Sequence, residues 1–229
     1  MNKPIISFIL PGFKFDRWVE IYNSIKANYP LEFELIIVSN FPPVTFDLME
    51  IYNIKYVRDF GAPPRCVNIG IEIAEGDFIS ILEDNIVING KFNEFSDNLN
   101  LGHKILLSQH DQKGPDVINK EYNFDCPWII SKKIFYELQL LDCKFESLNY
   151  SLKNLGSNIK KKYKKEIFIY NYKVYDQVFD NKQTVSYKPI KFAKIKDSFV
   201  DDKKNNLGWR EAPSVWERRR SPEKCDKPL

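Results

Sequence analysis

The stretch IISFILPG, residues 5–12, is a short and nearly all-apolar run that ends at a proline and a glycine. Such a run is typical of a strand that is covered on both faces, as in a parallel sheet. Similar runs follow at residues 33–38, 54–57 and 78–82, and a helical pattern that starts at Pro63-Pro64 separates the last two. This alternation of strand and helix predicts an α/β domain with a mostly parallel sheet.

The second half of the chain is less regular. We expect strands at residues 104–108, 128–131 and 167–174, and helices at residues 132–141 and 147–155, the second closed by Gly156. We interpret residues 1–196 as one domain, in which residues 1–100 form a nucleotide-binding half and residues 101–196 an acceptor half. Residues 197–229 are polar and charged, which indicates a C-terminal tail.

Composition excludes several classes of protein. With 43% apolar and 28% charged residues, the 229-residue chain has the make-up of a globular domain, which excludes wholesale disorder. The net charge of +3 is too small to indicate nucleic acid as a partner. Four cysteines without a CxxC pair favour reduced thiols and a cytoplasmic protein. No apolar window approaches the ~20 residues of a membrane span.

Ligands of open α/β sheets bind beyond the carboxyl ends of the strands, so the loops there are the first places to look for chemistry. The loop after the first strand has Gly12 alone, which excludes a GxGxxG dinucleotide fingerprint, and Gly90-Lys91 lacks the rest of a phosphate loop. The run Glu83-Asp84-Asn85 follows the fourth strand directly. It suits a divalent cation that also touches diphosphate oxygens, or else an ordinary turn that ends a strand.

Three motifs in the first ninety residues resemble family 2 glycosyltransferases. Residues 5–13 are similar to the opening strand and loop of that family, and residues 82–85 fall where it carries its acidic metal and nucleotide motif. Between them, Arg65, Asn68-Ile69-Gly70 and Ala74-Glu75-Gly76-Asp77 resemble its arginine, asparagine–x–glycine and alanine–x–glycine–aspartate signature. The resemblance implies the GT-A fold, a Rossmann-like mixed sheet with a parallel N-terminal half flanked by helices.

The resemblance also implies a nucleotide-diphosphate sugar as the donor. Pro11 and Phe13 would line the nucleotide pocket. Asn40 stands where the family has an aspartate that faces the base, and its amide can both accept and donate a hydrogen bond. Arg65 would grip the diphosphate, or else be a solvated residue at the start of a helix.

The resemblance also implies roles for the acidic run at residues 83–85. Glu83 would face the ribose or the base, and Asp84 would ligate a divalent cation, Mn²⁺ or Mg²⁺. Asn85 replaces an acid that is common in the family and would be a weaker metal ligand, which leaves loss of metal dependence open.

The acceptor side departs further from the family. Glu146 matches the first acid of its glutamate–aspartate pair and is our candidate for the catalytic base, but Ser147 stands in place of the aspartate. Asp142 in a shifted alignment, or an inactive copy, are the alternatives. Trp128 resembles the aromatic residue that stacks on acceptor sugars, or else belongs to the core. The basic run at residues 160–165 is a solvated face or a peripheral contact with an anionic membrane that carries a lipid-linked acceptor.

The resemblance implies transfer of a sugar to an acceptor hydroxyl, and we expect inversion and a role in polysaccharide or glycoconjugate synthesis. The main alternative is a catalytically silent domain of the same fold that binds nucleotide or glycan, because Ser39, Asn85 and Ser147 stand where the family has acids. A nucleotidyltransferase is a third interpretation, which the missing glycine-rich N-terminal loop disfavours.

Overall fold

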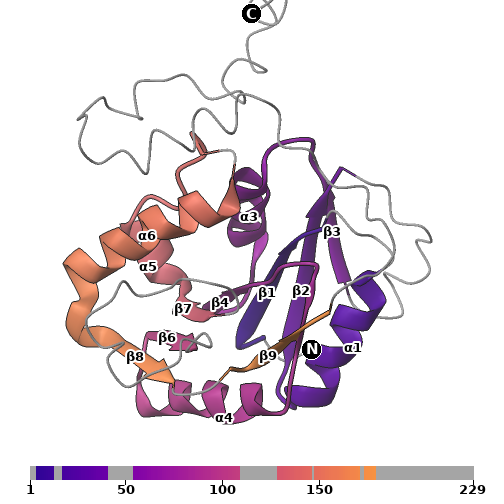
Figure 1. Ribbon diagram of the computed structural model, residues 1–229, viewed down its shortest axis with the longest axis horizontal. Helices are drawn as coiled ribbons and strands as arrows, with labels where there is room; N and C mark the ends of the chain where they lie inside the picture. The colour runs from indigo at the N-terminus through magenta and orange to yellow at the C-terminus, as the bar shows by residue number, and fades with distance from the viewer. Residues whose placement is uncertain are drawn as a thin grey trace, which may run out of the picture.

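The computed structural model describes residues 4–12, 17–40, 54–108, 128–145, 147–170 and 173–178. One seven-stranded sheet dominates it, in the order β3-β2-β1-β4-β7-β6-β8 (Figure 1). Its strands are β1 (Ile6–Pro11), β2 (Phe33–Ser39), β3 (Ile54–Arg58), β4 (Phe78–Ile81), β6 (Ile105–Ser108), β7 (Trp128–Ser131) and β8 (Ile167–Tyr170).

The directions of the strands confirm the predicted fold class. β1 pairs parallel with β2 and β4, and β2 pairs parallel with β3. β7 runs antiparallel to both β4 and β6, while β8 is parallel to β6. Of these seven strands, six therefore share one direction and β7 alone is reversed. The result is a mixed sheet with a parallel N-terminal half, flanked by helices.

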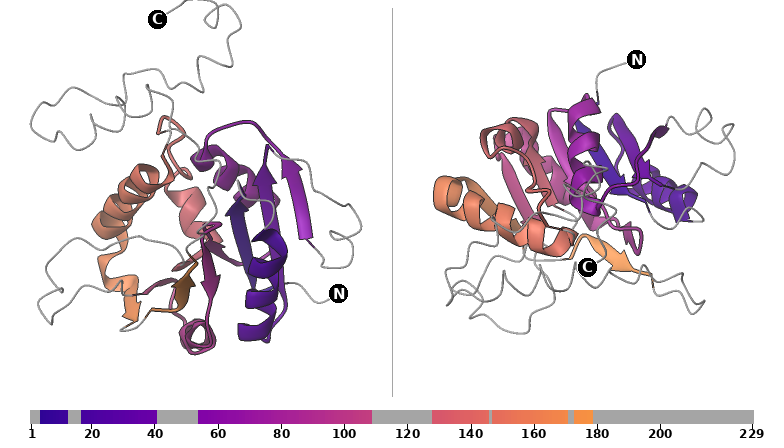
Figure 2. Two further views of the ribbon diagram at one scale, coloured as in Figure 1. Left: turned by 45° about the vertical axis from the view of Figure 1, so that its right-hand side comes forward. Right: turned by 90° about the horizontal axis from the view of Figure 1, so that it is seen from above.

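Helices cover both faces of the sheet. Figure 1 and Figure 2 show α1 and α4 against one face, and α3, α5 and α6 on the other side. Their bounds are α1 (Trp18–Asn28), α3 (Pro63–Ile73), α4 (Lys91–Asp97), α5 (Lys132–Glu137) and α6 (Leu148–Tyr163), with short 3-10 turns at η2 (Asn98–Leu101) and η4 (Lys164–Glu166).

Strand β1 shows why its sequence is apolar at nearly every position. All six of its residues are buried, because neighbouring residues point to opposite, covered faces. Phe8 packs against Tyr29 at the end of α1 and Phe92 of α4, with ring centroids 6.0 and 5.5 Å away. Ile9 faces α3, where a Cβ atom on Gly70 would lie 2.5 Å from Ile9 Cγ2. The glycine of the asparagine–x–glycine motif thus lets α3 approach the sheet.

Two helices differ in length from the prediction. α6 does not end at Gly156 but continues to Tyr163, because buried side chains at Leu152, Leu155, Ile159 and Tyr163 extend one apolar stripe across the glycine. α5 ends four residues earlier than expected, at Glu137. Gln139 (φ 65°) and Leu140 (φ 63°) adopt left-handed conformations that cannot continue a helix.

A small second sheet was not predicted. β5 (Ile86–Ile88) pairs antiparallel with β9 (Tyr175–Gln177), and each strand has three residues, too few for a visible alternation. The strand expected at residues 167–174 is shorter than predicted, since β8 ends at Tyr170, and β9 begins only at Tyr175. The predicted domain boundary at residue 196 and the tail lie outside the described residues. No described helix is long and apolar enough to cross a membrane.

Candidate functional site

The carboxyl ends of β1 to β4 meet at one edge of the sheet, which we call the carboxyl edge. The backbone N–H of Gly12 donates to Val38 O at 3.1 Å, and that of Leu82 donates to Ile9 O at 2.8 Å. These bonds bring the chain segments after β1, β2 and β4 together. Pro11, Asn40 and the Glu83–Asn85 run therefore lie at the same edge, as predicted, whereas Phe13 lies outside the described residues.

Several buried polar atoms at this edge have no hydrogen-bond partner among the described residues. They are Arg17 Nε, Trp18 Nε1, Asn40 Oδ1 and Asn85 Oδ1, whereas Arg17 Nη2 makes no hydrogen bond but pairs with the Glu20 carboxylate. Leaving such an atom unpaired costs about 1–3 kcal/mol, and each case in a native structure calls for an explanation. Two donors and two acceptors gathered at one edge match a polar ligand that both accepts and donates hydrogen bonds.

Sequence reasoning missed the first two of these residues. Trp18 was visible in the sequence only as part of the apolar stripe of a helix. In the structure its side chain is buried, and a Cβ atom on Gly12 would lie 2.7 Å from Trp18 Nε1. Its ring lies 5.8 Å from that of Tyr56, whose hydroxyl donates to Ser39 O at 3.3 Å. The absence of a side chain at Gly12 therefore places an indole N–H beside the ends of β1 and β2.

Arg65 lies in the first turn of α3, close to the end of β3. Its Nε donates to both carboxylate oxygens of Asp59, at 2.9 and 3.1 Å, and Asp59 Oδ1 also accepts from the backbone N–H of Gly61 at 2.8 Å. The Arg65 side chain is 25% exposed. Asp59 thus orients the guanidinium, a role that the sequence did not reveal. Contact with a diphosphate stays a prediction.

The acidic run forms the turn between β4 and β5. Glu83, Asp84 and Asn85 are all half-buried, and the backbone N–H of Ile86 donates to Glu83 O at 3.3 Å. The backbone oxygen of Asn85 accepts from the N–H of Val178 at 2.8 Å, which ties this turn to β9. The turn is therefore held by the small sheet as well as by the large one.

This turn offers oxygen ligands for a hard cation. In the part of the chain that the structure describes, no group of three His, Cys, Asp or Glu residues is placed to hold a metal. Asp84 supplies one carboxylate, and the buried, unpartnered Oδ1 of Asn85 is a second, neutral oxygen. Hard divalent cations accept such ligands and complete their shell with phosphate or water oxygens. A cation shared with a diphosphate at this turn stays a prediction.

The acceptor-side predictions fare differently. Trp128 is fully buried and stacks against Phe135, with centroids 5.7 Å apart and an interplanar angle of 27°. Its ring has no exposed face for a sugar, so the expected stacking role is corrected to a core position at the start of β7. Glu146 lies outside the described residues. Asp142 Oδ1 accepts from the backbone N–H of Lys144 at 2.9 Å, and Ser147 is the N-cap of α6.

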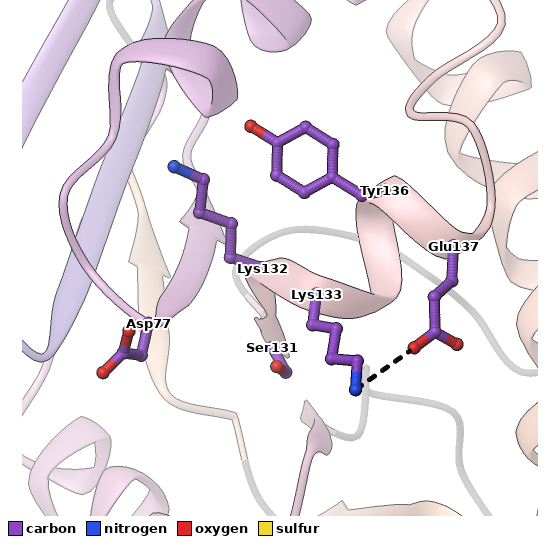
Figure 3. A pocket seen from close by; sticks show the side chains of 6 residues that line it. All are labelled: Asp77, Ser131, Lys132, Lys133, Tyr136 and Glu137. Atoms are coloured by element: carbon purple, nitrogen blue, oxygen red, sulfur yellow. Dashed lines mark ion pairs between the residues drawn. The ribbon is translucent and has the colours of Figure 1, made fainter.

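A surface pocket of about 740 Å³ lies at the opposite edge of the sheet (Figure 3). It is lined by Asp77, Ser131, Lys132, Lys133, Tyr136 and Glu137. Its charged side chains have partners within the protein: Lys132 Nζ donates to Ala74 O, and Glu137 pairs with Lys133 at 3.9 Å and with Lys162 at 3.2 Å. The pocket is therefore separate from the carboxyl edge and has none of its unpaired atoms.

Comparison with known proteins finds the fold but no sequence family. No family model matches the sequence, and no curated protein matches it. Among solved structures, TarS 1-349 of S. aureus in complex with UDP-GlcNAc superposes with a TM-score of 0.62 and 16% identity, over 86% of this chain and 66% of that one. The complex with UDP gives 0.56 and 19%, over 74% and 59%.

The chain therefore shares its mixed α/β fold with TarS. Without ligand, TarS 1-349 gives a TM-score of 0.58 at 19% identity, over 74% of this chain. The chain spans about three-fifths of TarS 1-349 in that match, 59% of its length. At this identity the likeness establishes the fold alone.

Proposed function

We propose that this chain binds a nucleotide-diphosphate sugar at the carboxyl edge and transfers the sugar to an acceptor hydroxyl. The observation that carries the proposal is the group of buried, unpaired polar atoms at that edge, since a ligand there would satisfy them. The fold supports it, because two of the similar structures are complexes with UDP and with UDP-GlcNAc. Membership of family 2 and a role in polysaccharide or glycoconjugate synthesis belong to the same proposal.

The donor would lie across the ends of β1, β2 and β4. Asn40 Oδ1 has an unused acceptor that suits an N–H group of the base, and Pro11 and Phe13 would form the wall of the nucleotide pocket. Glu83 would accept from the ribose or the base. Arg65, oriented by Asp59, would face the diphosphate.

Asp84 and Asn85 would hold a divalent cation, Mn²⁺ or Mg²⁺, together with diphosphate oxygens. When bound, such a cation neutralises the charge that develops on the leaving diphosphate. The role of Asp84 would be to supply the anionic ligand, and that of Asn85 to supply a neutral one that is already in place and unpaired.

Inversion at the sugar carbon requires a base on the acceptor side. The acceptor oxygen loses its proton as it attacks, and Glu146 is our candidate to take it. The acceptor would be a glycan or a lipid-linked sugar. The lysines at the end of α6 favour the second, because Lys160 and Lys161 are exposed and would attract an anionic membrane surface. That contact would be peripheral, at the cytoplasmic face.

A silent binding domain of the same fold is the second candidate. It is favoured by Ser147, a residue without useful basicity at neutral pH, at the N-cap of α6. Such a domain would bind the nucleotide and not cleave the donor.

Transfer and nucleotide affinity measured side by side test both candidates. With UDP-GlcNAc as the probe donor, Glu146→Gln should lower turnover about 10²–10⁴-fold and leave UDP affinity unchanged, because a general base acts on the acceptor alone. Normal turnover in that variant would remove Glu146 from the mechanism. If Ser147→Asp transfers and the natural chain does not, the silent domain is the correct interpretation. Absence of nucleotide binding in the natural chain would overturn both candidates.

A further inference from the structure

Arg17 is a buried cation at the start of α1 that none of the expected roles uses. Its side chain is 4% exposed, yet its Nε has no partner among the described residues. Nη1 donates to the backbone oxygen of Val178 at 3.5 Å, and Nη2 lies 2.9 Å from Glu20 Oε2, one turn along the helix. Burying a guanidinium is costly unless its charge and its N–H groups are matched. In Arg17, Nη1 and Nη2 have partners and Nε has none among the described residues.

The contact with Val178 places Arg17 beside the acidic turn. Ile86 is opposite Gln177 in the β5–β9 ladder, so Asn85 is opposite Val178, and the Val178 N–H donates to Asn85 O at 2.8 Å. The residue whose carbonyl Arg17 reaches is therefore the backbone partner of Asn85, which stands where the family-like metal motif has an acid.

The end of α1 adds a second attraction for an anion. Arg17 is the N-cap of this eleven-residue helix and makes no side-chain capping bond. The first amide N–H groups of a helix carry a partial positive charge of about half an elementary unit, which favours anions such as phosphate. Glu20 is the acid in the first turn, and its side chain is 52% exposed. An exposed carboxylate is weakly held, so an incoming anion can replace it.

We propose that Arg17 binds the diphosphate of the donor. Its positive charge adds to that of a divalent cation, which the turn at Asp84-Asn85 would bind weakly because Asn85 is a neutral ligand. Glu20 occupies the guanidinium in the absence of donor, and a phosphate oxygen takes its place on binding. This inference rests on the proposed function, because it assigns a residue to the same donor site. With Arg17 on the diphosphate, nucleotide binding should persist when the divalent cation is removed.

Calorimetric titration of the full chain with UDP, UMP and uridine, in chelator and in Mn²⁺, tests this assignment. In chelator, Arg17→Met should weaken UDP binding about 10- to 100-fold, as expected for a lost charge-assisted hydrogen bond. Uridine affinity should not change, and Mn²⁺ should restore part of the loss. Glu20→Gln is the matched variant, and it should tighten UDP binding relative to uridine because the competing carboxylate is gone.

The outcomes separate this inference from the proposed function. If the natural chain binds UDP and Arg17→Met weakens UDP and uridine equally, or neither, Arg17 is a structural residue and the inference is wrong while the donor site stands. If Arg17→Met does not fold, Glu20→Gln decides: unchanged discrimination between UDP and uridine overturns the inference. If the natural chain binds neither UDP nor uridine, the proposed function fails and this inference fails with it.

Discussion

The two edges of the sheet treat buried polar groups in opposite ways. At the amino edge, where β1, β2 and β3 begin, the carboxylate of Glu34 is buried: its Oε1 accepts hydrogen bonds, and its Oε2 makes an ion pair but no hydrogen bond. It accepts from Ser7 Oγ at 2.5 Å and from the backbone N–H of Gly76 at 3.2 Å, and it pairs with Lys55 at 2.7 Å. At the carboxyl edge, polar atoms of Trp18 and Asn40 are equally buried and have no described partner.

This difference assigns different tasks to the two edges. A buried polar network with all its partners in the chain stabilises the fold by itself. Buried polar atoms that lack partners lower stability until something binds to them, and such costs are typical of functional sites. The Glu34 network therefore helps to hold the strands together at the amino edge, and the unpaired atoms at the carboxyl edge are the basis on which we propose a ligand there.

One glycine of the family-like signature, Gly76, has a structural role at the amino edge. A Cβ atom on Gly76 would lie 2.6 Å from Ser7 Oγ and 2.7 Å from the Ser7 backbone nitrogen. Gly76 is thus required by close packing at the amino edge. The alanine–x–glycine–aspartate motif lies at the amino edge, opposite the proposed donor site, so its glycine contributes to folding.

The largest effect is expected from removal of Glu34. Glu34→Ala leaves the Ser7 hydroxyl, the Gly76 N–H and the Lys55 ammonium without their shared acceptor, which should lower the free energy of unfolding by about 3 kcal/mol. Urea denaturation measures the loss. The UDP affinity of the folded protein should not change. A UDP affinity that falls together with the free energy of unfolding would show that the two edges are not independent.

The next largest effect is expected at Asp84, on UDP affinity rather than on the free energy of unfolding. Asp84→Ala removes the anionic ligand from the proposed cation site, so the increase in UDP affinity on adding Mn²⁺ should shrink by at least about tenfold. Titration calorimetry with and without chelator measures it. Asp77→Ala, at the amino edge beside the pocket, is the control and should leave UDP affinity as it is.

A smaller effect is expected at Asn40. Asn40→Ala removes a buried acceptor that has no partner, so stability should hold or rise, and UDP affinity should fall about 3- to 10-fold through loss of one hydrogen bond. Asn40→Asp should bind UDP more tightly than the natural chain, since hydrogen bonds to a charged acceptor are stronger. Equal affinities in all three proteins would remove Asn40 from the base site.

The smallest effect is a change in the pH dependence of stability. Burial alone would raise the pKa of Glu34, but hydrogen bonds from Lys55, Ser7 and the Glu75 amide outweigh it and lower the pKa below the ordinary 4.5. The stabilisation is therefore complete above the unfolded-state pKa and is lost as the pH falls through the folded-state pKa. In Glu34→Gln, the free energy of unfolding should therefore fall less steeply with decreasing pH than in the natural chain. An unchanged slope would mean that other carboxylates dominate.

The sequence alone was sufficient for the fold class and for most strands. Buried parallel strands are apolar on both faces, so residues 5–12, 33–38 and 78–82 are readable without tertiary information. Parallel direction then brings the loops after these strands to one edge, which is why Pro11, Asn40 and Asp84 were placed correctly relative to each other. Local pattern and topology are enough for such predictions.

The tertiary structure decided what each side chain faces. Trp128 begins a strand, as predicted, but packing against Phe135 determines that its ring is buried. Arg17 and Trp18 look in sequence like ordinary residues at a helix start. That Arg17 Nε and Trp18 Nε1 are buried without a described partner depends on packing with distant segments such as Val178 and Gly12. Burial and hydrogen-bond satisfaction depend on residues far apart in the chain, so no local pattern encodes them.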